Sequence, residues 1–148
     1  MKYFFISIAS ILMMNVALGQ EVIPLYGDKK IPNSKETSNQ ERHEVRDNGT
    51  EIVHAISRPT MTVFLPPGSG AARTAVVIFP GGGYRINAIK HEGLDIARKL
   101  NEWGVAAFVV KYRIPDDVTM INKEIGPLQD AQQAIALVRR NATKWNID

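Results

Sequence analysis

The sequence predicts an α/β protein with a mostly parallel sheet and flanking helices, and three segments carry that prediction. Residues 75–79 (AVVIF) and 105–110 (VAAFVV) are each continuously apolar, which is typical of strands covered on both faces. Between them, residues 88–103 carry apolar side chains at helical spacing. A strand, a helix and a second strand in this order form a right-handed crossover, so we expect the two strands to be parallel.

The first residues predict the compartment. Lys2 precedes a short apolar run, residues 3–16, which is followed by the small residues Ala17 and Gly19. This pattern is typical of a secretory signal peptide, so residues 1–19 are expected to be removed and the protein to be secreted or periplasmic. No stable membrane span is then expected after cleavage; an uncleaved N-terminal anchor is the alternative.

The remaining chain is expected to divide near residue 50. Residues 20–50 are polar and show no helical or alternating period, which predicts a loop that wraps the domain formed by residues 51–148. Residues 47–49 (DNG) are a turn signal. Residues 51–57 and 60–65 are predicted to form strands that pair with each other in antiparallel fashion.

The two helices have recognisable ends. Gly104 follows the first helix at the position that favours a left-handed residue. Pro127 fits the first position of the second helix, and Asp130 lies in its first turn, where the helix dipole favours a negative charge. The apolar residues of this helix repeat at three and four, which predicts one packing face made of Leu128, Ala131, Ile135, Val138, Ala142 and Trp145.

Composition excludes several functions. The 148 residues carry a formal charge of +3, but the basic side chains are scattered, so we expect no nucleic-acid partner. The sequence has no cysteine and therefore no disulfide. Neither paired carboxylates nor clustered histidines have the spacing of metal ligands, and no cofactor or metal is predicted.

The most informative motif is residues 80–84 (PGGGY), directly after the first apolar strand. A dinucleotide-binding loop would need a glycine where Ile86 stands, and a P-loop would need Gly-Lys after the spacer, where Gly83 is followed by Tyr84. Consecutive glycines can instead turn bare amide groups toward a developing negative charge, as in an oxyanion hole. A tight strand-to-helix turn without a ligand is the alternative.

Several motifs together resemble a known family. PGGGY resembles the HGGG-type loop of α/β-hydrolase esterases and lipases, with Pro80 where many relatives have histidine. Residues 111–115 (KYRIP) are similar to the turn that these enzymes carry after the next strand, and residues 127–131 (PLQDA) to the helix before the nucleophile strand. The opening segments, residues 23–26 (IPLY) and 30–34 (KIPNS), resemble exported bacterial esterases associated with xylan breakdown.

The resemblance implies roles for six residues: Gly82 and Gly83 as oxyanion-hole donors, Tyr84 as a pocket-lining residue, and Tyr112, Arg113 and Asp130 as structural residues, with Arg113 paired to Asp130. His91 starts the first helix near the pocket mouth and is expected at most to line the pocket; an ordinary surface histidine is the alternative.

The catalytic serine of that family is not found. A Gly-x-Ser-x-Gly elbow followed by an acid and a histidine is required, and none of the serines after the signal segment has those flanks: Ser34, Ser38, Ser57 and Ser69. All three histidines, His43, His54 and His91, precede the point where the serine would fall. The sequence therefore resembles the N-terminal half of the fold, without the nucleophile strand and the C-terminal half. We expect this chain alone to be inactive, because it lacks the catalytic residues of the family. We also expect it to be poorly soluble, because the strand at residues 75–79 would keep an open edge.

The function implied by the resemblance is that of an exported serine ester hydrolase that, when complete, removes acyl groups from plant polysaccharide such as xylan. Its partners would be an acylated polysaccharide or a small ester. Two alternatives remain open: a noncatalytic exported module that binds glycans, and a peptidase of the same fold.

Overall fold

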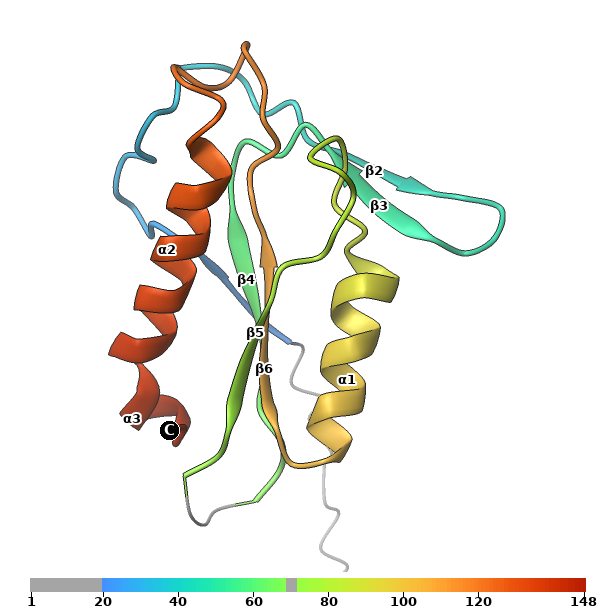
Figure 1. Ribbon diagram of the computed structural model, residues 1–148, viewed down its shortest axis with the longest axis vertical. Helices are drawn as coiled ribbons and strands as arrows, with labels where there is room; N and C mark the ends of the chain where they lie inside the picture. The colour runs from blue at the N-terminus through green and yellow to red at the C-terminus, as the bar shows by residue number, and fades with distance from the viewer. Residues whose placement is uncertain (1–19, 69–71) are drawn as a thin grey trace, which may run out of the picture.

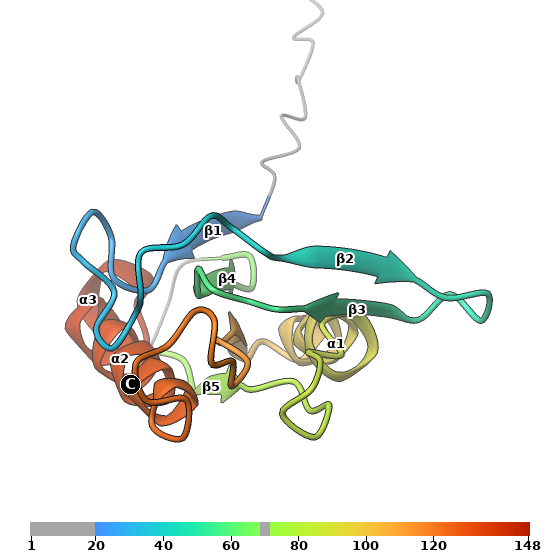
Figure 2. The same cartoon turned by 90° about the horizontal axis from the view of Figure 1, so that it is seen from above.

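The computed structural model describes residues 20–68 and 72–148, so the predicted signal peptide and Ser69 lie outside the described residues. A mixed sheet occupies the centre, and helices cover both of its faces (Figure 1). Seen from above, the two main helices lie on opposite sides of the strands (Figure 2). The α/β class with flanking helices is as predicted, but the sheet is mixed rather than mostly parallel, because two of its three strand pairings are antiparallel.

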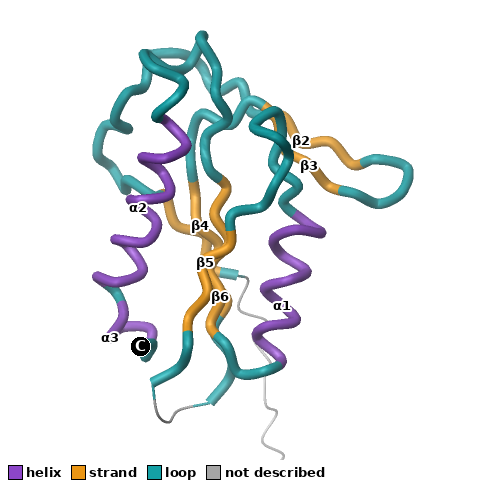
Figure 3. Tube along the Cα trace, in the orientation of Figure 1, coloured by secondary structure: helices purple, strands orange, loops and turns teal. Residues whose placement is uncertain are grey.

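The four strands of the sheet lie in the order β1 (Glu21–Pro24), β4 (Thr60–Phe64), β6 (Ala106–Lys111) and β5 (Ala75–Ile78). Strands β5 and β6 are parallel, whereas β4 is antiparallel to both β1 and β6. The predicted parallel pair is therefore confirmed. Because parallel strands end at the same edge, the loops after β5 and β6 both leave the sheet at one end of the molecule (Figure 3).

Strand β6 forms the centre of the core, since its side chains alternate between two buried faces. One face packs with the C-terminal helices α2 (Gly126–Arg140) and α3 (Ala142–Trp145), where the rings of Phe108 and Trp145 lie 4.8 Å apart. The other face packs with α1 (Asp95–Glu102), which follows a π-helical turn, η1 (Lys90–Leu94). The first helix ends at Gly104 with a φ of 79°, as predicted.

The N-terminal region differs from the prediction in two respects. Residues 20–50 are not a continuous loop, because they contain β1 and also β2 (Arg42–Val45), which pairs with β3 (Glu51–His54) around the predicted turn. The expected pairing of β3 with β4 is wrong, because β4 lies between β1 and β6 instead. The backbone turns between β3 and β4 at Ala55, whose φ is 48°. The β2–β3 hairpin extends away from the sheet (Figure 2).

The buried face of α2 matches the prediction only in part, since Val138 and, in α3, Trp145 are buried as predicted. Leu128 is 59% exposed and Ile135 38% exposed, whereas the buried residues of the helix are Gly126, Pro127, Asp130, Ala134 and Val138. A face predicted from apolar residues alone leaves out Asp130. The carboxylate of Asp130 points into the protein because its ion-pair partner, Arg113, is also buried.

Strand β5 lies at the edge of the sheet, and the last residues of the chain approach that edge. Ile147 forms a parallel bridge with Arg73, just before β5 begins. The Arg73 amide donates to the Asn146 carbonyl (3.1 Å), and the Asp148 amide donates to the Arg73 carbonyl (2.9 Å). Residues 146–148 therefore run alongside the chain that enters β5, in the same direction.

Candidate oxyanion site at the end of strand β5

The glycine loop, residues 80–84, leaves β5 with three successive positive φ angles. They are 142° at Gly82, 61° at Gly83 and 57° at Tyr84. A Cβ atom on Gly82 would lie 2.3 Å from the carbonyl oxygen of Ile86, so no other residue fits that position without movement. Next to Gly83, no heavy atom lies within 4 Å of the corresponding point, so this glycine faces open space.

The carbonyls and the amides of this loop differ in their hydrogen bonding. Its first three carbonyls all accept hydrogen bonds: Tyr112 Oη donates to Pro80 (2.8 Å), Ala88 N to Gly81 (2.9 Å) and Arg85 N to Gly82 (3.1 Å). The amides of Gly82 and Gly83, by contrast, donate to no acceptor within residues 20–68 and 72–148. Fixed carbonyls and adjacent unpaired amides make the loop a donor site suited to a negatively charged oxygen.

A cavity of about 580 Å³ opens beside this loop, and its volume falls in the range of small-molecule sites. Its walls come from the ends of β5 and β6 and from the start of α2: Phe79, Tyr84, Tyr112, Pro115, Lys123, Glu124, Pro127, Leu128 and Ala131. The Tyr112 ring lies 6.4 Å from Phe79 and 6.5 Å from Tyr84, which makes one side of the cavity aromatic. Tyr84 lines the cavity, but His91 is not among the lining residues.

Tyr112 holds the glycine loop as a neutral donor. Burial raises the pKa of its hydroxyl, and the neighbouring Tyr84 and Glu92 raise it further. A hydroxyl that keeps its proton can donate to the Pro80 carbonyl over a wide pH range.

The ion pair between Arg113 and Asp130 is present and completely buried, with both side chains 0% exposed. Arg113 Nη2 lies 2.8 Å from Asp130 Oδ1, and Arg113 Nε lies 3.0 Å from both carboxylate oxygens. The Arg113 backbone amide also donates to Asp130 Oδ2 at 2.8 Å. The pair therefore ties the turn after β6 to the N-terminal part of α2, next to the cavity; Asp130 lies just beyond the first turn of the helix, in which the sequence predicted it.

The chain is similar to known esterases in sequence and in structure. No protein-family profile matches the sequence. An acetylxylan esterase of Xylanibacter ruminicola is 39% identical over 88 residues, which cover 60% of this chain and 17% of that protein. The crystal structure of an acetyl ester-xyloside bifunctional hydrolase from Caldicellulosiruptor lactoaceticus superimposes with a TM-score of 0.59 at 30% identity, over 86% of this chain and 39% of that chain. A second structure, the α/β-hydrolase enzyme MGS-M1 from a deep-sea metagenome library, superimposes with a TM-score of 0.52 at 29% identity, over 61% of this chain and 37% of that chain.

The chain resembles α/β-hydrolase esterases in both sequence and fold. The predicted resemblance is thereby confirmed. The glycine loop lies between β5 and the helical turn η1, where the resemblance predicts the HGGG-type loop. The chain spans less than half the length of each relative, so the activity of a whole protein remains a proposal. No helix among the described residues is long and apolar enough to cross a bilayer.

The described part of the chain contains no serine–histidine pair. Ser34 accepts a hydrogen bond from Arg113, and Ser57 donates one to Asn39. The histidines contact carboxylates instead: His43 lies 2.9 Å from Glu41, His54 2.9 Å from Glu44, and His91 3.6 Å from Glu92. In residues 20–68 and 72–148, no three His, Asp or Glu side chains are grouped to hold a metal ion.

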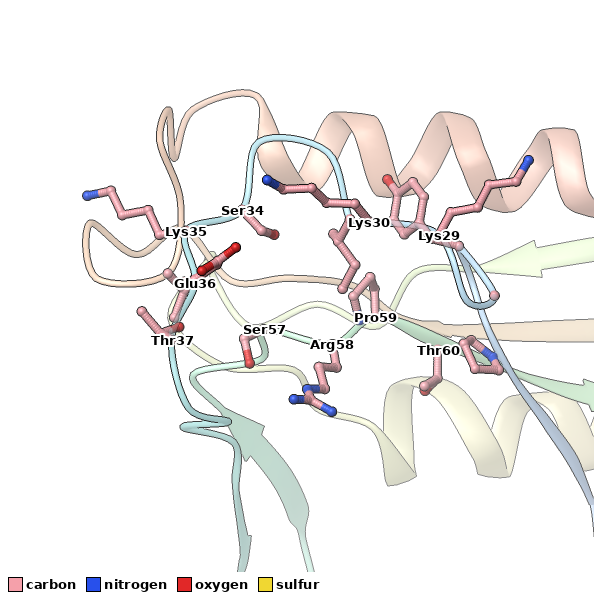
Figure 4. Close-up of a pocket in the computed structure, with 15 residues that line it drawn as sticks. Lys29, Lys30, Ser34, Lys35, Glu36, Thr37, Ser57, Arg58, Pro59 and Thr60 are labelled. Atoms are coloured by element: carbon pink, nitrogen blue, oxygen red, sulfur yellow. The ribbon is translucent and has the colours of Figure 1, made fainter.

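A second cavity, of about 420 Å³, lies between the N-terminal segment and the start of β4 (Figure 4). It is rich in basic side chains, but those of Lys29, Lys30 and Arg58 point in different directions (Figure 4). Lys35 is already used, since its ammonium group donates to the Asp117 carbonyl at 2.6 Å. This cavity shares no residue with the one beside the glycine loop.

Tyr26 is the structural residue that sequence reasoning missed. Its hydroxyl donates to Asp130 Oδ1 (2.9 Å), while Arg113 Nη1 donates to the Pro32 carbonyl (2.8 Å), so the N-terminal segment is attached to the buried pair. Tyr26 belongs to the IPLY segment, which was noted only as a resemblance. Burial raises the pKa of this hydroxyl, and the Asp130 carboxylate raises it further.

The raised pKa predicts a loss of stability at alkaline pH. Above about pH 10 the unfolded chain releases the Tyr26 proton while the folded chain keeps it, so the free energy of unfolding falls as the pH rises. A Tyr26→Phe variant should be less stable at pH 8, yet lose less stability between pH 9 and pH 11. Urea unfolding at pH 9 and pH 11 measures the free energy of unfolding of both proteins. An equal loss in the parent and in the Tyr26→Phe variant would contradict the raised pKa of Tyr26.

Proposed function

We propose that this chain is the N-terminal part of an exported serine ester hydrolase, which in its complete form removes acyl groups from plant polysaccharide such as xylan. The observation that carries the proposal is that the amides of Gly82 and Gly83, which donate to no acceptor among the described residues, lie beside a partly aromatic cavity at the carboxyl end of β5. The similarity to an acetylxylan esterase and to an acetyl ester-xyloside hydrolase supports the substrate class.

The proposed chemistry is acyl transfer through a tetrahedral intermediate. Attack on an ester carbonyl moves negative charge to its oxygen, and two amide donors that are already in place stabilise that charge. One such donor contributes roughly 2.7–4 kcal/mol to the transition state. The tight packing around Gly82 and the hydrogen-bonded carbonyls of the loop mean that little reorganisation is needed when the charge forms.

We propose that the nucleophile follows Asp148. Residues 146–148 run parallel to the chain entering β5, so a continuing strand would extend along the open edge of β5 and end beside the glycine loop. A Gly-x-Ser-x-Gly elbow is then expected within roughly ten to fifteen codons. The exposed Leu128 and Ile135 of α2 offer an apolar surface for the segment after that elbow.

The proposal predicts that the 148-residue chain has no measurable esterase activity, whereas the longer hydrolase encoded with it does. The oxyanion donors alone supply no nucleophile, so hydrolysis of 4-nitrophenyl acetate by the short chain should equal that of a boiled control. The same assay on the longer hydrolase should give turnover.

Two results would overturn the proposal. A soluble short chain that hydrolyses the ester above the control would show that the nucleophile lies elsewhere. A short chain that folds stably, binds acylated xylan oligosaccharides and has no longer counterpart would favour the noncatalytic binding module instead.

A further inference from the structure

We propose that Glu92 is a positioning residue for the glycine loop, because its carboxylate fixes the Gly81 amide and thereby restricts the directions of the next two amides. Gly81 N donates to Glu92 Oε2 at 2.8 Å. The consequence for catalysis rests on the proposed function, but the contact itself is a property of this chain and can be tested without any reaction.

A π-helical turn brings the carboxylate to the loop. In η1 the Leu94 amide donates to the Ile89 carbonyl (2.9 Å), five residues back rather than four. Such turns are rare in proteins as a whole, and those that occur are often found at functional sites. Gly93, which follows Glu92, lies directly against the start of the glycine loop, since a Cβ there would lie 2.8 Å from Pro80 Cγ. The close contact at Gly93 leaves Glu92 beside Gly81.

One peptide unit is consequently held at both ends. Tyr112 Oη donates to the Pro80 carbonyl, and the Gly81 amide of the same peptide group donates to Glu92, each at 2.8 Å. Glycine backbones otherwise sample many conformations, so fixing this plane restricts the directions of the following amides.

The negative charge of Glu92 does not itself help to stabilise an oxyanion. A carboxylate near an oxyanion raises the energy of the charged intermediate, because like charges repel. The useful property of Glu92 is therefore the reach of its acceptor oxygen to Gly81. A glutamine has the same reach without the charge, whereas an aspartate keeps the charge and is one methylene shorter.

Kinetics of the longer hydrolase separate reach from charge. Glu92→Gln should keep kcat within about threefold, and Glu92→Asp should lower kcat about 10- to 100-fold at an unchanged KM, since a misplaced donor weakens only the transition state. Glu102→Ala, which removes an exposed acid of the following helix α1, is the matched control. The opposite order, an active Asp variant and an inactive Gln variant, would overturn the proposal.

Hydrogen exchange tests the clamp independently of activity. In the 148-residue chain at micromolar concentration, Glu92→Asp should add one fast-exchanging amide to the peptide that spans residues 80–88, and Glu92→Gln should add none. An unchanged peptide in the Asp variant would overturn the clamp. If exchange responds as expected while every form of the longer hydrolase is inactive, the positioning contact stands and the proposed function fails.

Discussion

Replacing Gly82 with alanine should lower the kcat of the longer hydrolase by about 10²–10³-fold, the loss expected for one oxyanion-hole donor. The new Cβ would lie 2.3 Å from the Ile86 carbonyl oxygen and 2.7 Å from Ile86 Cγ1, and the φ of 142° is one that alanine rarely adopts. The loop must therefore move, and the amide directions must change with it. Steady-state kinetics on 4-nitrophenyl acetate measure the loss.

Gly83→Ala is the matched control for this prediction. Its φ of 61° lies in the left-handed region, which costs alanine about 1–2 kcal/mol, and no neighbouring atom obstructs the Cβ. The backbone can keep its path, so kcat should fall by less than about tenfold. A Gly82→Ala enzyme with parental kcat would show that the loop is only a structural turn.

Replacing Asp130 with asparagine should lower the free energy of unfolding of the longer hydrolase by about 3–5 kcal/mol. Arg113 is completely buried, and loss of the carboxylate leaves its charge without a counterion in the interior. Tyr26 would also lose its charged acceptor. Calorimetry or urea unfolding measures the change.

The control is an acid whose ion pair is exposed. Asp95 lies 2.6 Å from Arg98, but both side chains are about half exposed, so Asp95→Asn should cost at most about 1 kcal/mol. If Asp130→Asn melted at the parental temperature, the buried pair would contribute nothing to the fold, contrary to its geometry.

Sequence reasoning predicted the features that have a distinctive pattern. The apolar strands β5 and β6 follow from continuous burial, and the glycine loop from residues that no ordinary turn requires. The Arg113–Asp130 pair was inferred from the family resemblance, not from a local pattern. The hairpin strand β2 was missed because its four side chains are all exposed, so the sequence carries no alternation.

The errors near the site have a common physical cause. The rotation of α2 depends on a buried carboxylate, but a sequence pattern counts aspartate as a surface residue. Glu92 likewise reads as an exposed acid on a helix, and only the fold shows that its oxygen meets the Gly81 amide. Polar groups that are satisfied by distant backbone cannot be recognised from spacing alone.

The most direct measurement concerns the two amides themselves. When ¹⁵N-glycine-labelled longer hydrolase reacts with a 4-nitrophenyl phosphonate, the tetrahedral adduct places a charged oxygen where the ester oxygen would lie. The amide protons of Gly82 and Gly83 should both shift downfield and exchange more slowly in the adduct. If the resonances of these two glycines stay unchanged while those of other glycines near the cavity respond, the two amides do not form the oxyanion hole.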